Sequence, residues 1–130
     1  MSNKEFTKET WRQKLTSEEF NVCWENGTEP AFSGKFNNEK VSGTYVCKCC
    51  REPLFDSEKK YDSGSGWPSF FNVINDHAVN EISDHSYAMN RIEVTCANCG
   101  SHLGHVFSDG PMPTGLRYCI NSLSLDLVEK

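Results

Sequence analysis

The pattern of apolar and polar positions divides the chain into a helical start and a β-rich remainder. Residues 5–26 predict helical structure, because apolar side chains recur there at helical spacing. The positions that can form one apolar face are Leu15, Phe20, Cys23 and Trp24. Thr16 followed by Glu19 fits a capping box, and Gly27 fits a helix stop. We therefore expect short N-terminal helices.

From Thr44 onward the pattern changes to short strands. The stretches that alternate or are rich in β-forming residues are 44–49, 91–96 and 122–128. Within 91–96, Ile92 and Val94 are expected on one face of the strand. Clusters of Gly, Pro, Asn and Ser mark turns at 26–43, 62–66, 75–77 and 108–115. Short strands separated by turns predict an all-β sheet assembly or barrel.

Length and composition indicate that the predicted β assembly is one small domain. The 130 residues predict one domain over 1–130, with a helical segment at about 5–26 and a β core at about 44–128. A mean hydropathy of -0.58 indicates a modest core, for which a bound metal is a common staple. The net charge of -5 disfavours nucleic acid, whose binding usually needs a basic face. No run of about 18 apolar residues exists, so we expect no membrane span. We expect no nucleic-acid partner, and a monomer is the default expectation.

The cysteine count bears on the cellular compartment. Seven cysteines cannot all pair within one chain. The start of the chain, MSNKEFTKETWRQK, is polar and lacks the apolar segment of a secretory signal. We therefore expect a cytoplasmic protein whose cysteines are metal ligands or redox groups.

Four of the cysteines form two C-x-x-C motifs. CKCC supplies Cys47 and Cys50, and CANC supplies Cys96 and Cys99. Two such turns complete a tetrahedral four-thiolate site for Zn²⁺, provided that the fold brings them together. The alternatives are redox pairs, plain buried cysteines, a C-x-C arrangement that uses Cys49, or iron in place of zinc. Since zinc enclosed by four thiolates has no open position, a reactive centre must lie elsewhere.

Cys119, in the stretch LRYCIN, stands outside these motifs. On a strand, Arg117, Cys119 and Asn121 project from one face. A guanidinium near a thiol favours the nucleophilic thiolate, and an asparagine amide can donate to an incoming oxygen. A buried core cysteine is the alternative. The polar neighbours on the same face favour a nucleophile.

Two histidines and a tryptophan could complete such a site. His102 and His105 follow the second C-x-x-C motif directly, and Asp109 comes soon after, so a metal could hold this segment rigidly. A single histidine would more often be structural or exposed. Trp67 lies in a tight Gly-Trp-Pro segment and could wall an apolar pocket, or it could be a core residue.

Longer motifs resemble the B-type methionine sulfoxide reductases. They are CKCC, YDSGSGWPSF, RIEVTCANCGSHLGHVFSDGPMPTG and RYCINSLSL, and GTEPAFSGKF is similar to the N-terminal region of that family. The resemblance runs from about Thr16 to Leu125. It implies a mainly β fold of two antiparallel sheets, often called a β-tent, with N-terminal helices. It also implies reduction of the R epimer of methionine sulfoxide, free or in proteins, which repairs oxidised proteins.

By position, the resemblance also implies a role for each candidate residue. Cys119 matches the nucleophile, which becomes a sulfenic acid, and Trp67 matches the residue that packs on the S-methyl group of the substrate. The matches to polar active-site residues are His102, His105, Asp109, Arg117 and Asn121. The matches to the zinc ligands of metal-binding members are Cys47, Cys50, Cys96 and Cys99. A histidine suits delivery of a proton to the departing oxygen, and we favour His105.

Position 65 departs from the family pattern. Many members have a cysteine there that resolves the sulfenic acid as a disulfide, which thioredoxin then reduces. This chain has Ser65, which cannot form a disulfide. Cys23 is a candidate resolving cysteine, with a small apolar residue of the helix face as the alternative. A further alternative is direct reduction by thioredoxin or another thiol reductant.

Two other functions fit part of the pattern. A zinc-knuckle binding module would explain the four ligands but not the combination of cysteine, arginine and histidines. A redox-sensing thiol switch would need a reactive Cys119 but no substrate pocket around Trp67. Turnover of methionine sulfoxide distinguishes the enzyme from both.

Overall fold

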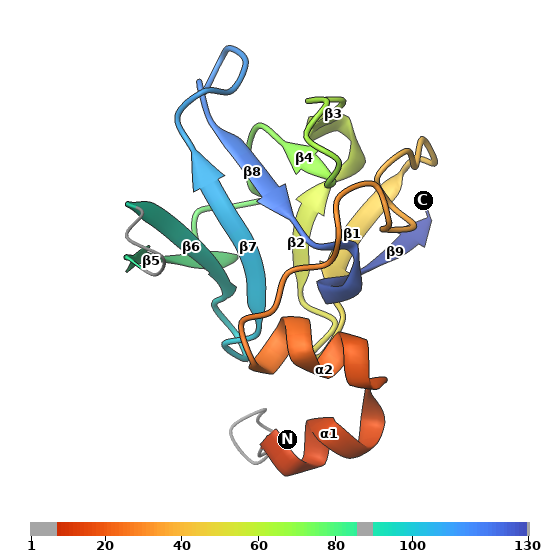
Figure 1. The fold of residues 1–130 in the computed structure, drawn as a ribbon. Coiled ribbons are helices and arrows are strands. Elements are labelled where there is room, and N and C mark those ends of the chain that lie inside the picture. Colours follow the sequence, from red (N-terminus) through yellow and green to blue (C-terminus); the bar gives the residue numbers. More distant parts are fainter. Residues whose placement is uncertain (1–7, 86–89, 130) are drawn as a thin grey trace.

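The computed structural model describes residues 8–85 and 90–129, in which two helices precede nine strands (Figure 1). Residues 5–7 of the predicted helical stretch lie outside the described residues. Within the described parts of the chain, neither helix is long and apolar enough to cross a membrane. Both helices lie at one end of the β core (Figure 1).

The predicted helical stretch forms two helices, α1 (Lys8–Lys14) and α2 (Ser17–Trp24). The break between them comes at Thr16, the N-cap of α2. Glu19 N donates to Thr16 Oγ1 at 3.1 Å, and Thr16 N donates to Glu19 Oε1 at 3.0 Å, so the predicted capping box is confirmed. The residues that α2 buries are Phe20, Val22 and Cys23.

Two antiparallel sheets form the β core, which confirms the predicted mainly β fold. The smaller sheet has the order β2-β1-β9, with β1 at Gly43–Cys47, β2 at Pro53–Asp56 and β9 at Leu125–Glu129. The larger sheet has the order β3-β4-β8-β7-β6-β5. Its strands are β3 (Lys60–Tyr61), β4 (Ser69–Phe70), β5 (Val79–Asp84), β6 (Arg91–Cys96), β7 (His102–Phe107) and β8 (Arg117–Ile120).

The predicted strands are confirmed with two differences. The strand expected at 122–128 begins at Leu125, because Ser122–Ser124 forms a short 3₁₀ helix. There Ser124 Oγ donates to Asn121 O at 2.8 Å, a local hydrogen bond that competes with strand pairing. In β6, Ile92 and Val94 differ in burial although they alternate onto one face: Val94 is fully buried and Ile92 is 42% exposed.

Aromatic side chains join the two sheets. Phe55 of the smaller sheet stacks on Phe70 of the larger sheet, with ring centroids 4.4 Å apart. Tyr45 meets the same Phe70 ring edge-on at 5.2 Å. Because all three side chains are fully buried, these contacts fix how one sheet sits on the other.

This packing places Cys119 inside the larger sheet. Cys119 lies on β8, where it pairs with Ser69 of β4 on one side and with His105 of β7 on the other. The neighbouring side chains Tyr118 and Ile120 are buried, while Cys119 is half-buried on the opposite face. The alternation therefore turns Cys119 away from the core.

Candidate active site

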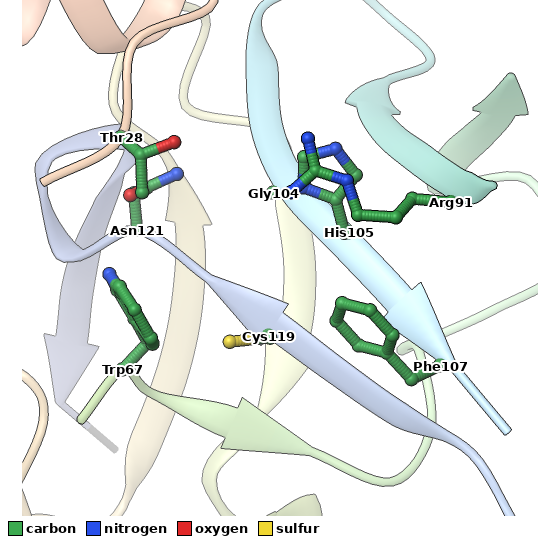
Figure 2. Close-up of a pocket in the computed structure, with 8 residues that line it drawn as sticks. All are labelled: Thr28, Trp67, Arg91, Gly104, His105, Phe107, Cys119 and Asn121. Atoms are coloured by element: carbon green, nitrogen blue, oxygen red, sulfur yellow. The ribbon is translucent and has the colours of Figure 1, made fainter. Parts of the chain in front are cut away.

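Cys119 opens onto a cavity of about 100 Å³ on the larger sheet. Its sulfur points toward Trp67, with Phe107 on the opposite side (Figure 2). The residues that line the cavity are Thr28, Trp67, Arg91, Gly104, His105, Phe107, Cys119 and Asn121. Among them are four of the predicted site residues: Trp67, His105, Cys119 and Asn121. The lining does not include three others, which are His102, Asp109 and Arg117.

Gly104 lets β7 and β8 lie close together at this cavity. A Cβ atom at position 104 would lie 2.0 Å from the carbonyl oxygen of Cys119. A larger residue would therefore push the strands apart. The glycine keeps His105 and Cys119 at directly paired positions of neighbouring strands.

Burial and polar contacts act on the Cys119 thiol in opposite directions. Burial raises its pKa and is the largest effect, because a thiolate loses hydration in the cavity. The Ser65 hydroxyl and the Arg117 guanidinium lower it. The predicted effect of Arg117 is therefore present, but burial outweighs it and the pKa of Cys119 is raised.

Three serine hydroxyls cluster beside the Cys119 sulfur. Ser63 Oγ donates to Ser65 Oγ at 2.8 Å and lies 2.7 Å from Ser69 Oγ. Ser65 Oγ lies 3.9 Å from Cys119 Sγ, within hydrogen-bonding range of sulfur. Position 65 therefore offers the thiol a hydroxyl group where many family members have a second thiol.

Asp109 and Phe107 hold the guanidinium of Arg117 in place. Arg117 Nε donates to Asp109 Oδ1 at 2.9 Å, and Nη2 donates to Oδ2 at 3.2 Å. The guanidinium carbon also lies 4.4 Å from the centre of the Phe107 ring. The hydrogen bond with Arg117 lowers the pKa of Asp109. Asp109 thus contacts Arg117 and not the cavity.

Each active-site histidine has its own carboxylate partner. His102 Nδ1 lies 2.7 Å from Glu93 Oε2, and His105 Nε2 lies 2.7 Å from Asp84 Oδ2. The two imidazole rings meet edge-on with centroids 5.6 Å apart. Burial lowers the pKa of His102, which is 4% exposed, so its imidazole is neutral at pH 7. His105 is the histidine that lines the cavity.

Asn121 and Trp67 are both bound by the backbone of Glu29. Asn121 Oδ1 accepts from Glu29 N at 3.0 Å, and Trp67 Nε1 donates to Glu29 O at 2.9 Å. Asn121 Nδ2 donates to Leu103 O at 3.0 Å. A side-chain amide has two N–H bonds, so one more can serve a group in the cavity.

The two C-x-x-C motifs come together away from this cavity. The sulfurs of Cys47, Cys50, Cys96 and Cys99 all lie within 4.8 Å of one another. The distance is 3.7 Å between Cys47 Sγ and Cys99 Sγ, and 3.5 Å between Cys50 Sγ and Cys96 Sγ. A tetrahedral zinc site with Zn–S bonds of about 2.3 Å has sulfurs about 3.8 Å apart. The four thiols therefore fit Zn²⁺.

The remaining two cysteines lie in the core. Cys49 and Cys23 are both buried, and neither lines the cavity at Cys119. Cys23 Sγ lies 3.9 Å from the carbonyl oxygen of Leu123. A hydrogen bond with Cys49, followed by burial, raises the pKa of the Cys23 thiol. The structure does not bring the predicted resolving cysteine to Cys119.

Several residues of the site were not predicted from the sequence. Thr28, Arg91 and Phe107 line the cavity, and Asp84 and Glu93 bind the histidines. They come from strands and loops that are far apart along the chain. Alternation of polar and apolar residues indicates the faces of these strands, but it does not show which strands pair.

Comparison with known proteins supports a common family. The SelR domain matches residues 15–129. The chain is 62% identical to the peptide methionine sulfoxide reductase MsrB of Saccharophagus degradans, over 92% of this chain and 89% of that protein. Proteins of the same name from Pseudomonas fluorescens and Pseudomonas aeruginosa are 59% and 57% identical, over 100% and 94% of this chain and 100% and 92% of their own lengths. These matches confirm the predicted resemblance and the expectation of an oxidoreductase. The chain therefore belongs to the SelR-domain family, together with the MsrB peptide methionine sulfoxide reductases.

Proposed function

We propose that this protein reduces the R epimer of methionine sulfoxide, free or in oxidised proteins, to methionine. The observation that carries the proposal is the half-buried Cys119 thiol, which faces a cavity walled by Trp67 and Phe107. The aromatic walls suit an S-methyl group, and polar groups on β7 and β8 suit the sulfoxide oxygen. Relatives that bear the MsrB name support the same substrate class.

The proposed first step is attack of the Cys119 thiolate on the sulfoxide sulfur. The sulfur–oxygen bond of the substrate breaks, the oxygen passes to Cys119, and methionine leaves. The methionine sulfur is reduced by two electrons, and Cys119 is oxidised by two electrons to a sulfenic acid. Ser65 and Arg117 stabilise the thiolate, because both lower the pKa of Cys119.

We assign delivery of the proton to His105. His105 lines the cavity, and the Asp84 carboxylate at 2.7 Å can stabilise its protonated form. His102 is buried behind it and supports its ring edge-on. His105→Asn should therefore reduce turnover more than His102→Asn. The opposite ranking in kcat would contradict this assignment.

Recycling of the sulfenic acid is proposed to use thioredoxin or another thiol reductant. Two external thiols form a disulfide, return Cys119 to the thiol and release water, which balances the reaction. Among the described residues, which include all seven cysteines, no second thiol lines the cavity. A resolving role for Cys23 is the alternative, and it would require Cys23 to leave the core.

Peptide mapping after one turnover separates the two routes. Cys23→Ser should keep full activity with thioredoxin, and no Cys23–Cys119 disulfide should be trapped in wild type. A trapped disulfide between these two residues, together with loss of thioredoxin-dependent turnover in Cys23→Ser, would establish the alternative.

We propose that Cys47, Cys50, Cys96 and Cys99 hold one structural Zn²⁺. Four thiolate ligands leave the ion no open position, so it stabilises the fold without taking part in the reaction. Iron in the same site would be distinguished by elemental analysis.

The wider setting is also a proposal. We infer a cytoplasmic monomer that repairs oxidised proteins under oxidative stress, with residues 1–130 as one domain. The presence of all seven cysteines as free thiols supports the compartment. Sedimentation of the purified protein tests the monomer.

The decisive experiment is turnover on the separate R and S epimers of N-blocked methionine sulfoxide. Excess dithiothreitol replaces the physiological reductant, so the recycling route does not affect the result. Wild type should act on the R epimer alone, and Cys119→Ser should be inactive. Folded, metal-loaded wild type without activity on either epimer would overturn the proposed function.

A further inference from the structure

Glu29 is a buried acidic residue in the segment between α2 and β1. We call residues 28–36 of this segment the strap, which runs along the β core (Figure 1). Glu29 is 3% exposed, and a carboxylate is costly to bury unless its contacts compensate. Within the described residues, its Oε2 atom makes no hydrogen bond, so an ion pair does not account for the burial.

The hydrogen bonds of Glu29 lead directly to the active site. Its backbone N–H donates to Asn121 Oδ1 at 3.0 Å, and its carbonyl oxygen accepts from Trp67 Nε1 at 2.9 Å. The side chain reaches the 3₁₀ helix that follows Asn121, where Glu29 Oε1 accepts from Leu123 N at 2.9 Å. The backbone of Glu29 therefore binds the side chains of both Trp67 and Asn121, and its own carboxylate anchors it to Leu123 N.

The strap is closely seated at this point. Phe32 N donates to Gly66 O at 2.7 Å, and a Cβ atom at Gly66 would lie 2.8 Å from Ala31 Cβ. On the other side, a Cβ atom at Gly34 would lie 2.3 Å from Glu29 Oε2. Loss of the carboxylate removes the bond to Leu123 N and leaves room in this confined space, so the backbone of Glu29 can shift, and with it the hydrogen bonds to Trp67 and Asn121.

We propose that Glu29 is a positioning residue that holds Trp67 and Asn121 in the orientation needed to bind the sulfoxide above Cys119. This inference rests on the proposed function. Glu29 does not line the cavity and acts through the two residues that do. Its removal should therefore weaken substrate binding while leaving the thiol itself reactive.

Three substitutions at this position test the idea. Glu29→Ala removes the anchor, Glu29→Asp keeps the charge but is too short to reach Leu123 N, and Glu29→Gln keeps an oxygen acceptor without the charge. We expect kcat/KM for the R sulfoxide to fall by about ten- to a hundredfold in Glu29→Ala, mainly through a higher KM. The kcat/KM of Glu29→Gln should stay within roughly threefold of wild type. The kcat/KM of Glu29→Asp should lie between the values of Glu29→Ala and Glu29→Gln.

Alkylation of Cys119 by iodoacetamide provides the second readout, measured by mass spectrometry of the Cys119 peptide. This small reagent does not need Trp67, so its rate at pH 7 should not fall in any of the three variants. The Glu29 charge raises the pKa of Cys119, so its removal should raise the rate by a similar factor in Glu29→Ala and Glu29→Gln. A generally loosened fold would instead separate these two variants. Glu39→Ala and Glu39→Gln are matched controls. Glu39 Oε2 also accepts a backbone N–H, from Val41 at 3.1 Å, but Glu39 borders a different cavity.

The possible results separate this inference from the proposed function. If Glu29→Ala fails to fold, the Asp and Gln variants decide, because the proposal requires Gln to be the more active. Equal kcat/KM in Asp, Gln and wild type would overturn the role of Glu29 while the wild-type turnover upholds the reaction. A loss in Gln at least as large as that in Asp would also overturn it, because charge would then matter as much as reach or more. Absence of wild-type turnover would overturn both.

Discussion

At the scale of single residues, polar neighbours limit the rise that burial causes in the pKa of Cys119, the proposed nucleophile. Burial raises the pKa of its thiol, and the Ser65 hydroxyl and the Arg117 guanidinium lower it. Arg117 is itself fixed by Asp109. The reactivity of the thiol thus depends on contacts that each contribute a modest amount.

Ser65→Ala should raise the pKa of Cys119 further. The substitution removes a hydrogen-bond donor that lies 3.9 Å from the sulfur, so the pH profile of Cys119 alkylation should move to higher pH. Turnover at neutral pH should fall by roughly two- to fivefold, as expected for one hydrogen bond worth about 0.5–1 kcal/mol. Ser42→Ala, at an exposed position before β1, is the control. An unchanged profile would show that Ser65 does not bind the thiolate.

His102 should titrate below the ordinary histidine value of about 6.5. Burial lowers its pKa, and the hydrogen bond with Glu93 opposes this only in part. In the unfolded chain His102 takes up a proton as the pH falls below about 6.5, while in the folded protein it stays neutral to lower pH. The contribution of His102 to the free energy of unfolding should therefore decrease as the pH falls from about 6.5 to the lower pKa of His102 in the folded protein.

Ring-proton NMR, assigned with His102→Asn, measures this value directly. A titration of His102 above the ordinary value would mean that Glu93 and Asp84 outweigh burial. His102 could then also supply a proton, and the assignment of His105 as the proton donor would need revision.

At the scale of elements, the pairing of β7 and β8 determines the distance between the proposed nucleophile and the histidines. His105 and Cys119 sit at paired positions, and Ser69 of β4 pairs with Cys119 from the other side. Strand pairing thus places Cys119, His105 and Ser69 on three neighbouring strands, while Trp67 and Thr28 reach the cavity from loops. A site on paired strands is held more firmly than one on loops.

Gly104→Ala should disturb this pairing. The added Cβ would lie 2.0 Å from the carbonyl oxygen of Cys119, and such overpacking typically costs about 1–3 kcal/mol. We expect a lower free energy of unfolding in urea. We also expect turnover to fall by more than the loss of folded protein accounts for. Gly64→Asn is the comparison, because a Cβ there would meet nothing within 4 Å and asparagine tolerates the positive φ of 75°. Wild-type stability and activity in Gly104→Ala would contradict the argument.

At the scale of the whole molecule, the four-cysteine cluster connects the two sheets. Cys47 ends β1 of the smaller sheet, and Cys96 ends β6 of the larger sheet. A metal ion bound by both motifs would clamp the sheets at this end, while Phe55 and Phe70 hold them together in the core. The cluster is thus placed to stabilise the angle between the sheets.

Removal of the metal should destabilise the whole fold. Structural zinc contributes about 10–16 kcal/mol in zinc-finger peptides, and we expect at least about 3 kcal/mol here, where a core also contributes. Chelation, or Cys96→Ser, should lower the thermal midpoint, and elemental analysis should show one zinc per chain in wild type. Cys49→Ser is the matched control and should keep the metal, because Cys49 is not one of the four clustered thiols. Full metal content in Cys96→Ser would overturn the ligand assignment.

Local sequence was sufficient to predict the classes of element and the groups that carry chemistry. Capping at Thr16 and a strand at 91–96 depend on neighbours in the chain, and both predictions are confirmed. The two C-x-x-C motifs predicted a four-thiolate cluster, because a short turn can present two sulfurs to one ion. The prediction of a strand at Ser122–Ser124 was wrong, since the Ser124 hydroxyl donates to the local backbone at Asn121 O.

Local sequence could not predict the contacts between segments that are far apart in the chain. The pairing of His105 with Cys119, the carboxylates of Asp84 and Glu93 behind the histidines, and the anchor at Glu29 all join residues far apart in the chain. The same holds for the balance at Cys119, where burial outweighs the expected effect of Arg117. Hydrophobic pattern and turn chemistry act over a few residues, whereas burial and hydrogen bonding at the active site depend on how the two sheets and the strap pack together.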